Sequence, residues 1–221
     1  YHPAKFYHYN KVKNEVGWNS LGLLQMLNVK YVITLKNFLH PDFELVFSGK
    51  LLYSGKNILA NVYEFKKGLP RAFYVEKIKK IKNEESQIDF LRNKEFNPSM
   101  FSFIDKEFED FLYDPNAKIK IQHWSPDKIV LKTVASSKQL LILSEIYYPE
   151  GWKITSEPKL NIQRINYLLR GLFIPEGTNE IVIEFIPDDI YYGTVITISS
   201  TIIIILLIIV GFYLEKRNNG I

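Results

Sequence analysis

Two stretches of the 221-residue sequence, residues 144–153 and 164–177, combine aromatic rings with neighbouring Arg and Glu side chains. This combination is common on carbohydrate-binding surfaces, because the apolar ring faces stack on sugar C–H groups while the charged groups bond hydroxyls. Four side chains are therefore candidates for contact with an acceptor glycan: Tyr147, Tyr148, Tyr167 and Arg170.

The same stretches also have a structural interpretation, which we favour over the binding one. Trp152 stands between a turn and an alternating strand, where its ring would fill the core of a β-domain. Arg170 would then be held by a carboxylate such as Glu145 at a sheet edge. In this interpretation Trp152, Glu145 and Gly171 form a structural motif.

No pattern for catalysis or metal binding accompanies these stretches. The chain has no cysteine, so thiolate ligands and cysteine nucleophiles are excluded. The four histidines share no metal-ligand spacing: His2, His8, His40 and His123. Three neighbouring carboxylates read as the polar face of a short helix: Glu107, Glu109 and Asp110. We expect no catalytic residue, cofactor or metal in this chain.

The charge balance indicates neither disorder nor nucleic-acid binding. There are 28 Lys+Arg and 24 Asp+Glu, a net charge of +4, and 47% of the residues are hydrophobic. The mild excess of base is spread along the chain, so no nucleic-acid partner is expected. In the lysine-rich run 77–82 the alternating isoleucines favour a half-buried strand over a headgroup-binding patch.

Residues 1–110 are expected to form a mixed α+β segment. Asn19 or Ser20 can cap a short helix, and Asn83 can cap a second helix that ends near residue 93. Strands are expected between them, with Gly49 and Gly55 marking turns: 29–34, 43–47, 51–53, 59–65 and 71–75.

Residues 117–187 contain only strand patterns. About seven short runs alternate with turns every 8–12 residues, which is typical of a mainly antiparallel β-sandwich or a partly closed barrel. The region 107–116, with its Asp-Pro-Asn sequence, is the expected boundary between this domain and the mixed segment.

Residues 191–214 are expected to form one transmembrane helix. The 21 residues from Thr194 to Leu214 contain no charge, and such a helix is about 31 Å long, close to the thickness of a bilayer's hydrocarbon core. Lys216 and Arg217 follow it, and basic residues favour the cytoplasmic side. Residues 1–190 should then be extracytoplasmic and the tail 215–221 cytoplasmic.

The motif order of the chain resembles that of YfhO-type membrane proteins. The similarity lies in residues 143–153, in residues 164–177 and in the terminal apolar helix, with weaker similarity at residues 27–33 and 69–73. Such proteins are multi-pass and resemble glycosyltransferases of the GT-C class, which transfer sugars from lipid carriers to cell-surface polymers. The resemblance implies that the other membrane helices and the catalytic acid lie upstream of Tyr1.

The resemblance further implies that this part serves as a lid or an acceptor-binding module. Its expected partners are the membrane, the upstream helices, a lipid-linked sugar and a cell-surface polymer. Two other classes stay open: a membrane-anchored carbohydrate-binding or adhesion module, and a purely structural ectodomain.

Overall fold

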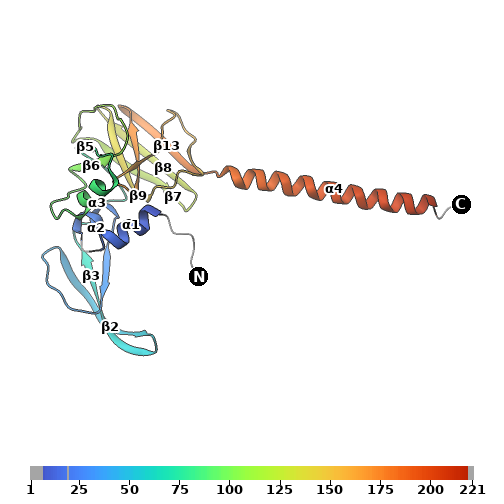
Figure 1. Ribbon diagram of the computed structural model, residues 1–221. Helices are drawn as coiled ribbons and strands as arrows, with labels where there is room; N and C mark the ends of the chain where they lie inside the picture. Colours follow the sequence, from blue (N-terminus) through green and yellow to red (C-terminus); the bar gives the residue numbers. More distant parts are fainter. Residues whose placement is uncertain (1–6, 19, 219–221) are drawn as a thin grey trace.

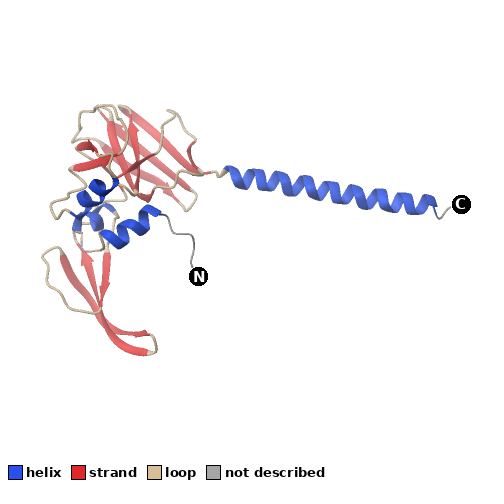
Figure 2. Cartoon of the chain, in the orientation of Figure 1, coloured by secondary structure: helices blue, strands red, loops and turns tan. Residues whose placement is uncertain are grey.

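A computed structural model describes residues 7–18 and 20–218. Sheets form most of the body, and one long helix leaves it at the C-terminal end (Figures 1 and 2). The elements follow in this order: α1 (Tyr7–Glu15), α2 (Leu21–Met26), β1 (Tyr31–Thr34), β2 (Phe43–Tyr53), β3 (Lys56–Phe65), β4 (Ala72–Tyr74), β5 (Lys77–Lys80), α3 (Glu84–Arg92), β6 (Phe101–Ile104), β7 (Lys118–Trp124), β8 (Lys128–Ala135), β9 (Gln139–Ile146), β10 (Trp152–Ile154), β11 (Gln163–Ile165), β12 (Leu169–Ile174), β13 (Gly177–Phe185) and α4 (Asp188–Asn218).

Two four-stranded antiparallel sheets form the expected β-sandwich. Their strand orders are β10-β13-β8-β7 and β11-β12-β9-β4. Alternate residues of β8 and β13 point inward and meet side chains of β9 and β12 in one apolar cluster. Its buried members are Ala72, Ile129, Leu131, Leu141, Leu143, Leu172, Ile174, Ile181 and Ile183.

The second sheet is covered on both faces, which explains the unbroken apolar run in β9. Leu141 and Leu143 face the other sheet, whereas Leu140 and Ile142 belong to a separate cluster with side chains of α1, α2 and α3. A strand covered on both faces has no reason to alternate. β4 lies in this sheet beside β9, so strands from both sides of the 107–116 region share one sheet and one core.

The first part of the chain also forms a three-stranded sheet of order β1-β3-β2, which projects from the body (Figure 1). Gly49 was expected at a turn, but β2 continues through it from Phe43 to Tyr53. A Cβ at Gly49 would lie 2.6 Å from the Phe47 ring, so the glycine makes room for that ring. The reversal occurs at Ser54–Gly55, both with positive φ, as a tight hairpin turn requires.

The two predicted N-caps within the described residues are confirmed. The Ser20 hydroxyl accepts from the Leu23 amide, and the Asn83 side chain accepts from the Ser86 amide. The alternative cap Asn19, like His2, lies outside the described residues. The run 107–110 is irregular, so the expected short helix is absent from it. Glu107 forms an ion pair with Lys80, and Glu109 forms one with Lys138.

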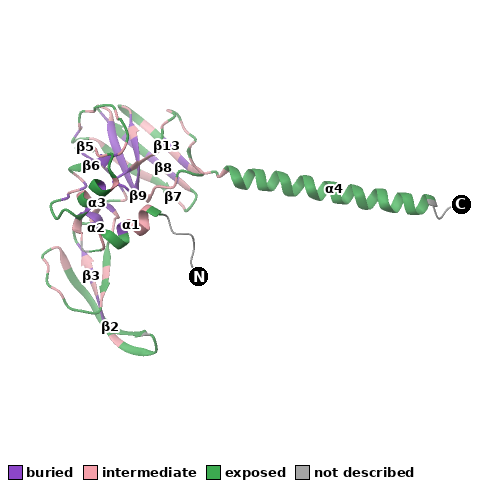
Figure 3. Ribbon diagram, viewed as in Figure 1, coloured by how far each residue is buried: buried purple, intermediate pink, exposed green. Residues whose placement is uncertain are grey.

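α4 is the predicted membrane helix, with no part buried against the rest of the described chain (Figure 3). It is long and apolar enough to cross a bilayer, with a mean hydropathy of 2.9 in its most apolar window. The hydroxyls of Thr194, Thr197 and Thr201 donate to carbonyls four residues earlier, which satisfies them without water. Ser200 bonds three residues back, to Thr197.

Candidate functional site

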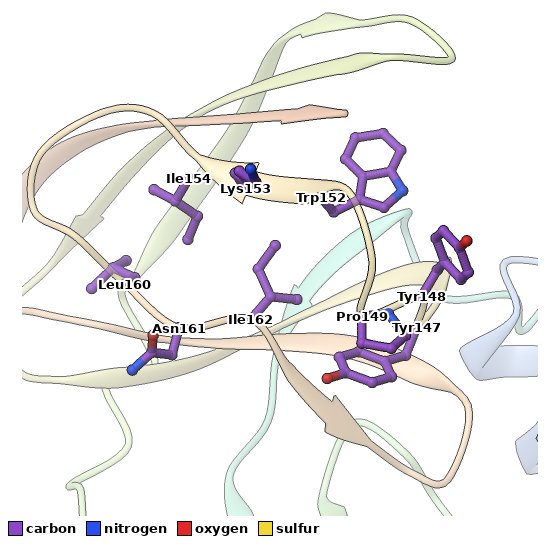
Figure 4. Close-up of a pocket in the computed structure, with 9 residues that line it drawn as sticks. All are labelled: Tyr147, Tyr148, Pro149, Trp152, Lys153, Ile154, Leu160, Asn161 and Ile162. Atoms are coloured by element: carbon purple, nitrogen blue, oxygen red, sulfur yellow. The ribbon is translucent and has the colours of Figure 1, made fainter. Parts of the chain in front are cut away.

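An aromatic pocket of about 210 Å³ lies where β9 ends and β10 begins. The loop that precedes β11 forms its other wall. Figure 4 shows the rings of Trp152 and Tyr148 at one end, with Leu160 and Asn161 at the opposite end. The lining residues are Tyr147, Tyr148, Pro149, Trp152, Lys153, Ile154, Leu160, Asn161 and Ile162.

The loop that forms the aromatic wall is fixed by a glycine turn. Gly151 has a φ of +92°, which L side chains rarely adopt, and a Cβ there would lie 2.6 Å from the Phe185 ring. The Gly151 carbonyl accepts from the Ile186 amide at 2.5 Å. Trp152 then pairs with Phe185 as β10 joins the edge of β13. These contacts set the position of the Trp152 ring.

Trp152 is supported from one side by Arg170. The guanidinium carbon lies 4.0 Å from the centre of the indole, a cation–π stack, and Arg170 is only 5% exposed. Its Nε donates to the Ile146 carbonyl at 3.1 Å, while Nη1 has no hydrogen-bond partner among the described residues. Burial lowers the pKa of Arg170 to about 10, with a smaller opposing effect from Glu145. Arg170 therefore holds the ring in place.

The structure corrects two details of the predicted structural motif. Trp152 is only partly buried: it packs at the edge of the sandwich core and is one of the residues that line the pocket. Glu145 bonds Arg71 at 2.5 Å, and not Arg170 as expected. Arg71 in turn stacks on Trp124, 4.4 Å from the ring centre. The partner of Glu145 is therefore Arg71, and Arg170 stacks on the indole of Trp152.

Gly171 is a packing residue, as its place in the motif suggested. It lies in β12 opposite Gln163, and a Cβ would come within 3.0 Å of the Ile165 side chain. Ile165 is fully buried, so it has little room to move aside.

The four candidate glycan contacts are not brought together. Tyr147 and Tyr148 line the pocket, whereas Arg170 is not among the lining residues and stacks on Trp152. Tyr167 is 2% exposed and belongs to the other core cluster, where its hydroxyl donates to Glu84 and its ring meets His8. A ring buried this deeply cannot stack on a sugar, so Tyr167 is removed from the glycan-contact set.

The pocket is also tied to the start of the membrane helix. Lys153 pairs with Asp188, the first residue of α4, at 2.6 Å. The Tyr148 hydroxyl donates to Glu150, and burial, Glu150 and Asp189 raise the pKa of Tyr148, so this phenol stays protonated and can donate.

Sequence reasoning did not find the wall formed by residues 160–162. Their Leu-Asn-Ile pattern reads as the start of a strand, yet the strand begins only at Gln163. No local signal separates the two readings, because what distinguishes them is the pairing of β11 with β12. The described residues contain no group of three or more His, Cys, Asp or Glu side chains that could hold a metal ion.

A β-sandwich joined directly to one long apolar helix defines a membrane protein with a folded domain outside the bilayer. The family model described as "Bacterial membrane protein YfhO" matches residues 78–197, just over half of the chain. The chain therefore belongs to the YfhO family. No curated protein and no solved structure matches it.

Proposed function

We propose that this chain is the membrane-proximal outer part of a GT-C-type glycosyltransferase, and that its aromatic pocket binds the glycan acceptor. The sugar donor would be a lipid-linked sugar, the acceptor a cell-surface polymer, and the catalytic carboxylate would lie upstream of Tyr1. Residues 1–190 would be extracytoplasmic in this arrangement.

The observation that supports the proposal most is where the pocket lies. Ile186 bonds Gly151, and Lys153 pairs with Asp188, so the pocket is fixed within one turn of the point where the chain enters the apolar helix. A glycan held there stays close to the bilayer surface, where a lipid-linked donor must present its sugar.

The pocket's chemistry suits a neutral or weakly polar saccharide. Trp152 contributes a partly exposed indole, and the oxygen of the Tyr148 hydroxyl, which donates to Glu150, can still accept a hydrogen bond from a sugar hydroxyl. Lys153 and Asn161 provide hydrogen-bond donors on the facing walls. None of these residues forms the nucleophile or acid–base pair that sugar transfer needs, which agrees with a binding role.

The test uses the chain in detergent micelles with cell-wall polysaccharide fragments, followed by saturation-transfer NMR. Signal transfer to the sugar should be lost in Trp152→Leu and retained in Trp124→Leu, a matched change of a tryptophan outside the pocket. Equal loss or equal retention in both variants would remove the pocket from the proposal.

A second measurement separates the transferase from the anchored adhesion module. Full-length protein in membrane vesicles should transfer sugar from a lipid-linked donor, and Trp152→Leu should raise KM for the acceptor. Glycan binding without any transfer by the full-length protein would favour the adhesion module. Absence of both would leave a structural ectodomain.

A further inference from the structure

The distal part of the β2–β3 hairpin is an apolar projection, which we call the finger and define as residues 45–60. It extends away from the body beyond the strand β1, which pairs only with residues 61–64 of β3 (Figure 1). Its large apolar side chains are exposed to solvent: Phe47 is 62% exposed, Leu52 70% and Leu59 56%. Monomeric soluble domains rarely leave such a group uncovered.

The finger is apolar on both of its faces. Successive residues of a strand point to opposite sides, so Leu51 and Leu52 lie on opposite faces. Leu51 is opposite Ile58 in the ladder and shares its face with Phe47, whereas Leu59 shares the face of Leu52. A second copy of the chain, or another protein that docks on one side, would cover one face of the finger and leave the other face exposed to water. A medium that surrounds the finger covers both.

The charges on the finger indicate what that medium is. Residues 45–60 contain two cations, Lys50 and Lys56, and no carboxylate. Lysines beside exposed leucines are the composition of segments that bind anionic lipid surfaces. The helix α4 anchors this chain to a bilayer, so a lipid surface is available to the finger at high effective concentration.

The backbone limits how deep the finger can go. Beyond β1, the strands β2 and β3 pair only with each other among the described residues, so both outer edges present unpaired N–H and C=O groups. Such edges are not tolerated in hydrocarbon but are satisfied by headgroups and interfacial water. We propose that the finger inserts shallowly into the headgroup region of a bilayer that contains anionic lipid. The inference does not depend on which side of the membrane the domain occupies.

The test exploits the absence of cysteine from the chain. Leu52→Cys, labelled with an environment-sensitive fluorophore, is reconstituted as the full chain into vesicles of neutral lipid with or without anionic lipid. Spin labels placed near the headgroup or near the chain end serve as quenchers. Headgroup labels should quench the finger more strongly than chain-end labels.

Two positions calibrate the measurement. Ile204→Cys, in the middle of α4, should be quenched best by the chain-end label. Thr178→Cys lies at the far end of β13 from α4, about 23 Å from Phe185 at about 3.3 Å per residue, and should not be quenched. Lys50→Gln with Lys56→Gln should weaken the contact between the finger and anionic lipid roughly 10- to 30-fold, which appears as a loss of lipid quenching at Leu52→Cys.

Each outcome decides the proposal. Quenching at Leu52→Cys that requires anionic lipid supports it. Absence of lipid quenching with a normal melting temperature overturns it, and so does disulfide formation at Leu52→Cys between two copies, which would show that another chain covers the finger. Quenching unaffected by anionic lipid or by the lysine substitutions overturns the charge-based recognition.

Discussion

Gly171 allows the packing of the second sheet to be tested quantitatively. In β12 it pairs with Gln163 on one side and Ile142 on the other, so its backbone is fixed by two strands. A Cβ at this position would lie 3.2 Å from Cδ1 and 3.3 Å from Cβ of Ile165, and closer than 3.0 Å to its Cγ1. Ile165 has no exposed surface, so its side chain cannot swing into solvent.

We therefore expect Gly171→Ala to destabilise the domain by about 1–3 kcal/mol, the usual cost of forcing an extra carbon into a packed core. For a domain of this size each kcal/mol lowers Tm by roughly 2–4 °C. The drop should be measured by circular dichroism on the full chain in detergent, where the sheet signal reports the β-domain.

A double-mutant cycle identifies the cause. Ile165→Ala removes the atom that the new Cβ would strike, although alone it should cost about 2–5 kcal/mol. Combined with Gly171→Ala, the total should be smaller than the sum by roughly 0.5–3 kcal/mol. Strictly additive costs, or a Gly171→Ala protein that melts like the parent, would refute the steric argument.

Three further predictions follow from the site, a partly buried histidine and the membrane helix. Trp152→Ala should lower the free energy of unfolding by about 1–3 kcal/mol in denaturant titrations, less than the roughly 3–5 kcal/mol of a fully buried ring, because the indole is only partly buried. Burial first, and then Arg164, lower the pKa of His8 below its ordinary 6.5, with Lys11 acting alike and Glu84 and Asp105 opposing. Stability is then complete above pH 6.5 and declines as the pH falls from there through the folded-state pKa; His8→Gln should flatten this decline in melts from about pH 8 to about pH 5. In intact cells a cysteine at Asn116 should react with an impermeant maleimide and one at Asn219 should not, and the reverse pattern would overturn the proposed orientation.

Local patterns predicted those elements whose environment changes across the strand or along the helix. In β8 every second residue is buried over the whole strand, and the apolar block of α4 is free of charge, so periodicity and length were sufficient. The cap at Asn83 was equally readable, because capping depends on one side chain and its nearest amides.

The misread positions are those whose roles depend on distant partners. Gly49 suggests a turn because glycine is common in turns. It lies inside the strand β2 instead, where the ring of Phe47 packs over it. The residues next to Tyr167 in sequence do not show whether its ring is buried. The ring is buried in the fold, and its hydroxyl donates a hydrogen bond to Glu84, 83 residues away. Glu145 pairs with Arg71, far upstream, while Arg170 stacks on the indole of Trp152. No local rule contains this information.

The short connection between β13 and α4 links the pocket to the membrane helix. β13 pairs with β10 up to Phe185, and α4 begins at Asp188, so only Ile186 and Pro187 separate the last ladder pair from the helix. Ile186 is itself bonded to Gly151 in the pocket loop. A displacement of α4 that moved Ile186 would therefore move the Trp152 wall of the pocket or break this hydrogen bond. Under the proposed function, the membrane helix would help to set the position of the bound acceptor. A rearrangement of the upstream helices during transfer would then change that position.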